Sequence, residues 1–248
     1  MRLALERCMR DMGTRTAVES GWRSTAAASA LRERVNAWIR HGRHKLAYVR
    51  FSSIPRRLLR RVKKAVWQTT EVRMYAMEAA AVRHLANPCM MRRDCLDDVQ
   101  EYEPAEAWQP SKEDFLRDVA EGMRAGAHIY TYAEGGRLLH HGWLTERQPE
   151  AVLAEVGQRH PLPPDSAVLA GFYSHPRARG RGLYRMALAQ MLHDATGIAG
   201  ATQIYVWVTA DNGPSRHVIE KLRFVYQGSF FQRKRPTGTA RWTSAPES

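Results

Sequence analysis

The strongest constraint on the fold of this 248-residue chain is a basic, glycine-containing segment at residues 173–183, which reads YSHPRARGRGL. It lies between an apolar run, 167–172, and a stretch with apolar residues at helical spacing, 181–195. This order predicts a strand, a tight turn and a helix. Glycine lets the backbone approach a ligand closely, and the first turn of a helix offers unpaired N–H groups. The turn is therefore predicted to bind an anion, most naturally a pyrophosphate.

The glycine spacing distinguishes this turn from two common phosphate-binding motifs, because it fits neither G-x-G-x-x-G nor G-x-x-x-x-G-K-[ST]. It reads R-x-x-G-x-G, with Arg177, Gly180 and Gly182. About thirty residues later come Asn212-Gly-Pro-Ser215 and a short helical stretch that ends at 222–224. Together these residues resemble the coenzyme A-binding core of the GNAT N-acetyltransferase superfamily, over residues 166–231.

The resemblance implies an α+β fold, in which a central, mostly antiparallel twisted sheet is flanked by helices. It also implies acetyl-CoA as co-substrate and no metal. Backbone groups of residues 172–174 would pair with the pantetheine arm, amides of the glycine turn would hold the pyrophosphate, and Asn212 would contact the arm. The predicted donor-binding residues are Phe172, Tyr173, Ser174, Ala178, Arg179, Gly180, Arg181, Gly182, Leu183, Asn212 and Ser215.

The proton-handling positions depart from the family pattern. Ile219 stands where many members have a tyrosine, Trp207 where some have a glutamate, and Arg223 where many have a glycine. Three explanations stay open. The amine loses its proton to water, with proximity supplying most of the rate, other groups take over, or the fold binds an acyl donor without performing ordinary acetylation. Because side chains alternate along a strand, His140 and His141 are expected on opposite faces. The candidate catalytic residues are Tyr173, His140 and His141, with His175 and Tyr205 as further groups.

Positive charge is concentrated in the first third of the chain. Residues 1–73 contain 18 Lys and Arg against 5 Asp and Glu, whereas the remaining residues contain 20 of each. Residues 1–70 are predicted to form a basic, partly disordered and partly helical extension, with an amphipathic helix at 54–67. Such a helix packs on the catalytic domain, or residues 31–67 contact an anionic membrane surface or an acidic protein such as acyl carrier protein. Nucleic acid is the less favoured partner.

The rest of the chain is predicted to form a GNAT domain at 71–232 and a flexible tail at 233–248. A near-capping box, Ser111 with Asp114, marks one helix start. The expected strands are 72–77, 127–133, 137–144, 167–172, 201–208 and 224–231, and the expected helices are 94–102, 111–125, 149–158, 181–195 and 214–222.

Localisation follows from what the sequence lacks. No stretch reaches the roughly 18 to 20 apolar residues of a membrane span, and the N-terminus has no apolar signal core. Cys8, Cys89 and Cys95 lack zinc-ligand spacing and read as reduced cysteines. The protein is predicted to be cytoplasmic, with peripheral contact at the inner face of the membrane through its basic extension.

The predicted function is transfer of an acetyl group from acetyl-CoA to a primary amine of a small molecule, such as an amino sugar, a glycan precursor or an amino acid. In this family the region corresponding to 72–144 usually builds the acceptor pocket, and here it is rich in aromatic, histidine and acidic residues. Two alternatives stay open. One is an N-acyltransferase that takes a longer acyl chain from acyl carrier protein, and the other is a basic nucleic-acid-binding module with an inactive core.

Overall fold

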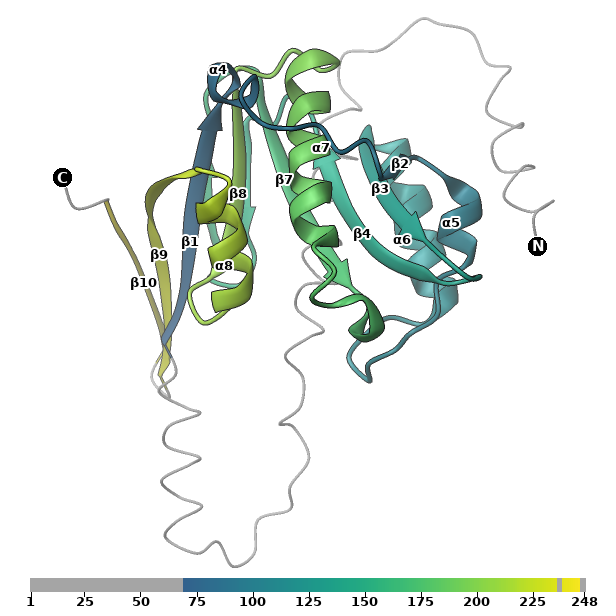
Figure 1. Ribbon diagram of the computed structural model, residues 1–248. Coiled ribbons are helices and arrows are strands. Elements are labelled where there is room, and N and C mark those ends of the chain that lie inside the picture. Colours follow the sequence, from purple (N-terminus) through teal and green to yellow (C-terminus); the bar gives the residue numbers. More distant parts are fainter. Residues whose placement is uncertain (1–68, 236–237, 246–248) are drawn as a thin grey trace, which may run out of the picture.

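A computed structural model describes residues 69–235 and 238–245 (Figure 1). They form the α+β fold that the sequence predicts. In chain order, the elements are β1 (Thr69–Glu78), α4 (Ala79–Val82), β2 (Arg92–Arg93), α5 (Leu96–Gln100), α6 (Lys112–Arg124), β3 (Ala127–Ala133), β4 (Leu138–Thr145), β5 (Glu150–Leu153), β6 (Gln158–Pro161), β7 (Ser166–Ser174), η1 (Pro176–Ala178), α7 (Leu183–Gly197), β8 (Gln203–Thr209), α8 (Gly213–Lys221), β9 (Val225–Arg235) and β10 (Gly238–Ser244).

Eight strands form one sheet in the order β10-β9-β1-β8-β7-β4-β3-β2, and β5 and β6 form a separate hairpin. Every neighbouring pair in the described sheet is antiparallel except β7 and β8. The predicted mostly antiparallel sheet is therefore confirmed. The first strand, β1, lies inside the sheet between β8 and β9 and pairs with both along its length.

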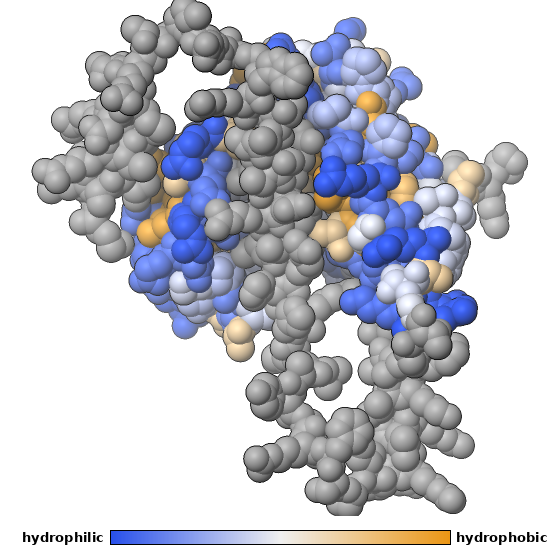
Figure 2. All heavy atoms as spheres, turned by 180° about the vertical axis from the view of Figure 1, so that it is seen from behind, coloured by the Kyte–Doolittle hydropathy of each residue, from blue (hydrophilic) through white to orange (hydrophobic). Residues whose placement is uncertain are grey.

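Both faces of the sheet are covered. Helices α7 and α8 lie on one face (Figure 1), where α7 packs on β7 and β4. Helix α6 packs on β3 from the other face, and the β5–β6 hairpin covers Val72 and Met74 of β1 on that side. Figure 2 shows the face opposite to the view of Figure 1, where hydrophilic residues dominate the coloured surface and apolar ones are scattered.

Helix α7 buries the stripe that its sequence predicts. Leu183, Ala187 and Met191 are buried against the sheet, and Met186 is half-buried. Gln190 also lies in this stripe; its side chain accepts from the N–H of Met91 and donates to the carbonyl of the same residue, at 2.7 and 2.9 Å. A buried amide with both groups paired in this way costs little.

Strands β7 and β8 pair only over their first halves. The pairing joins Ser166–Leu169 to Gln203–Val206 and then stops, although β7 continues to Ser174 and β8 to Thr209. The register of β7 against β4 shifts near Gly171, whose φ is +63°. This bulge bends β7 where it leaves β8. Toward its carboxyl end, the edge of β7 that faces β8 therefore pairs with no strand among the described residues.

The helix predicted at 149–158 is wrong, because the structure has the β5–β6 hairpin there. Ala151 and Leu153 alternate with more exposed residues and are fully buried over the sheet. A short apolar run does not distinguish a helix from a strand by itself. Residues 150–153 form a strand because they pair with Gln158–Pro161.

The flexible tail predicted at 233–248 is also wrong over most of its length. Strand β9 continues to Arg235, and Gly238–Ser244 forms β10 at the sheet edge. Trp242 of β10 stacks on Phe231, with ring centroids 5.0 Å apart and an interplanar angle of 4°. Polar composition suggests a loop, but an edge strand with two exposed faces tolerates the same residues.

Two further boundaries differ from the predictions. Helix α5 starts two residues later than expected, because Asp94 adopts φ +53° and its carboxylate accepts from the N–H of Ile129 at 3.0 Å. Strand β1 begins at Thr69, inside the predicted extension. The predicted helix at 54–67 and the contact segment 31–67 lie outside the described residues. Of the helices described, none is both long and apolar enough to cross a membrane.

Candidate functional site

The predicted donor turn connects β7 to α7. Gly180 and Gly182 have φ values of +80° and +78°, and a Cβ on either would meet no atom within 4 Å. Conformation, and not crowding, therefore requires glycine at both positions. Helix α7 begins directly after Gly182 with no side-chain cap, so its first N–H groups remain open. With fifteen residues, this helix also places the positive end of its dipole at the turn.

The arginines of the turn differ in their partners. Arg179 pairs with Glu106 and Arg181 pairs with Glu134, each at 2.7 Å. Arg177 has no acidic partner among residues 69–235 and 238–245, and its N–H donates to Nδ1 of His175 at 3.2 Å. His175 thereby caps η1 and fixes the entry to the turn. Among the three arginines of this turn, Arg177 is therefore the one whose charge is not already paired with a described carboxylate.

His140 lies on the α7 face of the sheet. Its Nδ1 is 2.8 Å from the Ser174 hydroxyl, and its ring centroid is 6.3 Å from those of Phe172 and Tyr184. Burial, together with the neighbouring His141, lowers the pKa of His140 to about 3. The imidazole is therefore neutral at neutral pH.

His141 lies on the opposite face, as the alternation along β4 predicts. Its ring is between those of Phe115 and Tyr173, with centroids 5.2 and 5.8 Å away. Burial lowers its pKa to about 4. The two adjacent imidazoles are thus both neutral but face different cores.

Tyr173 shares the face of His141 and contacts the loop between α5 and α6. Its hydroxyl donates to Gln109 at 3.3 Å, and its ring lies edge-on to Trp108, 5.8 Å away. Burial, helped by the carboxylate of Glu106, raises the pKa of Tyr173 to about 12. Through Glu106 and Arg179 the same loop reaches the donor turn.

A pair of hydroxyl groups joins the first turns of α7 and α8. Ser215 donates to the Tyr184 hydroxyl at 2.9 Å, and the Tyr184 ring lies edge-on to Phe172 at 4.9 Å. Asn212 accepts from the N–H of Ser215 at 3.2 Å and so caps α8. Because each helix follows its strand, this pair lies at the carboxyl ends of β7 and β8, beside the part where they no longer pair. Burial raises the pKa of Tyr184 to about 12.

Sequence reasoning missed Tyr184, because it sought a tyrosine seven residues after Asn212. The available signal was a hydroxyl residue in the first turn of both helices. Ile219 is fully buried in the core, and Trp207 is half-buried on the other face of β8. Arg223 has φ +67°, so the chain keeps a left-handed conformation where the family favours glycine.

The structure brings most predicted donor residues to one end of the sheet. Phe172, Tyr173 and Ser174 end β7, Ala178 is buried in η1, and Leu183 begins α7. Asn212 and Ser215 face them from α8, through the contact of Ser215 with Tyr184. Tyr205 belongs to the opposite core, under the β5–β6 hairpin.

At this end of the sheet, a strand that leaves its parallel neighbour is followed by a glycine turn and by a helix whose start has no side-chain cap. The chain belongs to the GNAT acetyltransferase family: residues 78–225 match the family model "Acetyltransferase (GNAT) domain". This confirms the resemblance seen in the sequence, and the protein is an acyltransferase.

Solved structures show similar proteins at low identity. A GNAT-family acetyltransferase from Colwellia psychrerythraea is 14% identical, with 89% of this chain and 76% of that chain covered and a TM-score of 0.48. A protein assigned to the GNAT family from Novosphingobium aromaticivorans is 16% identical, with 67% and 64% covered and a TM-score of 0.44. A predicted acetyltransferase with acetyl-CoA from Clostridium acetobutylicum is 12% identical, with 62% and 89% covered and a TM-score of 0.33. A comparison with curated proteins finds no match.

Proposed function

We propose that this protein transfers an acetyl group from acetyl-CoA to a primary amine of a small molecule. The observation that carries the proposal is the donor turn, in which two left-handed glycines precede the uncapped first turn of α7. Open N–H groups and a positive helix dipole favour a pyrophosphate at this point. Arg177 adds an available positive charge.

The pantetheine arm would follow the free edge of β7. Between Ala170 and Ser174, β4 pairs with one edge of β7, whereas no described strand pairs with the edge facing β8. An extended ligand can hydrogen-bond to such an edge as an added strand does. The thioester would then lie beside Phe172 and the neighbouring hydroxyl of Tyr184.

Tyr184 is the proposed proton donor to the leaving thiolate. The amine nitrogen bonds to the thioester carbonyl carbon, the carbon–sulfur bond breaks, and the Tyr184 hydroxyl protonates the sulfur. Its raised pKa keeps it protonated at neutral pH, and a proton from water can return to Tyr184 through the Ser215 hydroxyl, which gives up one proton and takes another. The proton of the amine leaves to water.

The catalytic roles predicted for Tyr173, His140 and His141 remain predictions. The lowered pKa values of the imidazoles make them weak bases at neutral pH. A role for His140 would act through its contact with Ser174. Tyr173 lies toward the α5–α6 loop, and we propose this side for the acceptor because Trp108 and Gln109 line it.

Titration calorimetry with acetyl-CoA tests the donor site. The variant Gly180→Ala/Gly182→Ala adds a Cβ on the ligand side and strains both left-handed positions by about 1–2 kcal/mol each. The variant Gly126→Ala/Gly200→Ala is the matched control, because both residues have positive φ and open surroundings away from the turn. We expect micromolar binding by wild type and control, and loss in the turn variant.

Two outcomes would contradict the proposal. Equal acetyl-CoA affinity of both double variants would show that the turn is not part of the donor site. No binding by a folded wild type would favour an acyl group carried by acyl carrier protein.

A further inference from the structure

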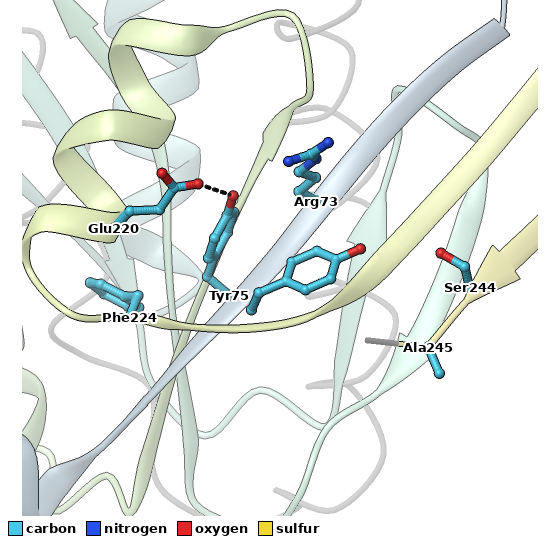
Figure 3. A pocket seen from close by; sticks show the side chains of 7 residues that line it. Arg73, Tyr75, Glu220, Phe224, Ser244 and Ala245 are labelled. Carbon is cyan, nitrogen blue, oxygen red and sulfur yellow. Dashed lines mark hydrogen bonds between the residues drawn. The ribbon is translucent and has the colours of Figure 1, made fainter. Parts of the chain in front are cut away.

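A pocket lies near the carboxyl end of α8, whereas the contact of α8 with the donor site, Ser215 with Tyr184, lies in the first turn of that helix. It has a volume of about 560 Å³ and is bordered by β1, α8, β9 and the end of β10 (Figure 3). Several of its residues lie outside the family-matched segment 78–225, so family membership does not account for it. The lining residues are Arg73, Tyr75, Glu220, Phe224, Tyr226, Ser244 and Ala245.

The pocket contains an available carboxylate. Glu220 accepts a hydrogen bond from the Tyr75 hydroxyl at 2.8 Å, and Tyr75 itself is only 2% exposed. The Glu220 side chain is exposed, and it has no ion pair with a basic side chain in the part of the chain that the structure describes. This fixed carboxylate is suited to a ligand ammonium group.

A guanidinium lies across the Tyr75 hydroxyl from this carboxylate, as Figure 3 shows. Arg73 donates from Nε to Glu71 at 2.8 Å, and Glu71 also accepts from Ser229 at 2.8 Å. The pair holds the Arg73 side chain in place, with 35% of it exposed. Its terminal nitrogens can then form a forked contact with a ligand carboxylate.

Aromatic rings form the apolar wall. Tyr75 and Tyr226 meet edge-on with centroids 5.8 Å apart, and Phe224 is buried beside them. The Tyr226 hydroxyl is paired with Ser229 at 2.7 Å, so its ring is oriented as well. An apolar side chain would bury its surface against these rings.

We propose that this pocket binds a free α-amino acid with an apolar side chain. The ammonium group contacts Glu220, the carboxylate contacts Arg73, and the side chain packs on the rings of Tyr226 and Phe224. A lone amine or a lone acid satisfies only one of the two charges. The volume falls within the roughly 300–1,000 Å³ typical of small-molecule pockets.

The test compares three probes that share a phenyl ring: L-phenylalanine, 2-phenylethylamine, which lacks the carboxylate, and 3-phenylpropanoate, which lacks the ammonium group. Titration of the full chain is expected to show saturable binding of L-phenylalanine. Because a charged hydrogen bond contributes about 1.5–3 kcal/mol, each analogue should bind about tenfold to a hundredfold more weakly. Equal affinity for all three probes would overturn the proposal.

Two variants assign the contacts. Glu220→Gln should weaken the binding of L-phenylalanine about tenfold or more and leave the affinity for 3-phenylpropanoate unchanged. Arg73→Gln should leave the affinity for 2-phenylethylamine unchanged. Glu113→Gln and Arg124→Gln, both exposed on α6, are matched controls that should change nothing. Acetyl-CoA binding by each variant, measured in parallel, reports folding and keeps this site separate from the donor turn. A uniform loss for every probe, or no L-phenylalanine binding by protein that binds acetyl-CoA, would refute the assignment.

Discussion

The two halves of the sheet, on either side of the β7–β8 pair, handle polar groups differently. In the half with β4, β7 and α7, the imidazoles of His140 and His141 are buried and neutral, and the donor turn offers backbone N–H groups. In the half with β1, β9 and α8, Arg73 and Glu220 carry charges at an open pocket. Ligand binding in the first half would therefore depend on backbone conformation and on burial away from water. In the second half it would depend on the identity of the charged side chains.

The largest expected effect comes from removing one hydroxyl in the first half. Tyr184→Phe keeps the ring against Phe172 but loses the contact with Ser215. Because general acids contribute about 10²–10⁴-fold, kcat should fall at least about a hundredfold with the KM for acetyl-CoA unchanged. Steady-state kinetics measure both values. An unchanged kcat would show that the thiolate leaves without this proton.

Acid should destabilise the first half through its imidazoles. The folded pKa values of His140 and His141 lie below the unfolded value near 6.5, so the unfolded state binds more protons as pH falls through this range. Between pH 7 and pH 5 each imidazole should remove about 2 kcal/mol of stability. Urea unfolding of wild type, His140→Gln and the exposed-site control His217→Gln measures this. The first variant should show a shallower pH dependence, and identical slopes would place the titration elsewhere.

Packing beside the free edge of β7 should tolerate little added volume. A Cβ on Gly142 would lie 2.4 Å from the Phe172 ring. Gly142→Ala should therefore cost about 1–3 kcal/mol of stability and weaken acetyl-CoA binding as Phe172 moves. Gly197→Ala, where a Cβ meets open space, is the control. Thermal unfolding measures the loss of stability, and calorimetry measures the affinity for acetyl-CoA. Wild-type affinity in Gly142→Ala would show that Phe172 does not move.

The smallest effect concerns the side chains of the donor turn. Arg177→Ala should weaken acetyl-CoA binding by about tenfold or less, and added salt should reduce the difference. Arg179→Ala and Arg181→Ala should change the affinity less, because their charges are paired with Glu106 and Glu134. If Arg179→Ala or Arg181→Ala weakened binding as much as Arg177→Ala, the pairing with Glu106 and Glu134 would not set the contribution of each charge.

Local signals predicted the parts of the fold that depend on local physics. The glycine turn, the Ser111 cap and the opposite directions of His140 and His141 follow from spacing and alternation, and the structure has all three. The β5–β6 hairpin and β10 were missed because their partners, and not their own residues, decide their conformation.

The contacts that the sequence did not predict are those that the fold makes between distant positions. Tyr184 and Ser215 are 31 residues apart, and Tyr75 and Glu220 are 145 apart. No periodicity or motif spacing reports such contacts. Only the strand order, with β1 placed beside β9, creates the pocket at Glu220.

The position of β1 has a consequence for synthesis of the chain. β1 is the earliest strand described, yet one of its two neighbours is β9, and Thr69 meets Arg233 across 164 residues. A ribosome must therefore release nearly the whole domain before β1 gains its second partner. Both edges of β1 stay unpaired until β8 is synthesised, and one stays unpaired until β9 follows, which is the condition that favours aggregation. Helper proteins that shield nascent strands should thus affect the yield of this protein more than its final stability.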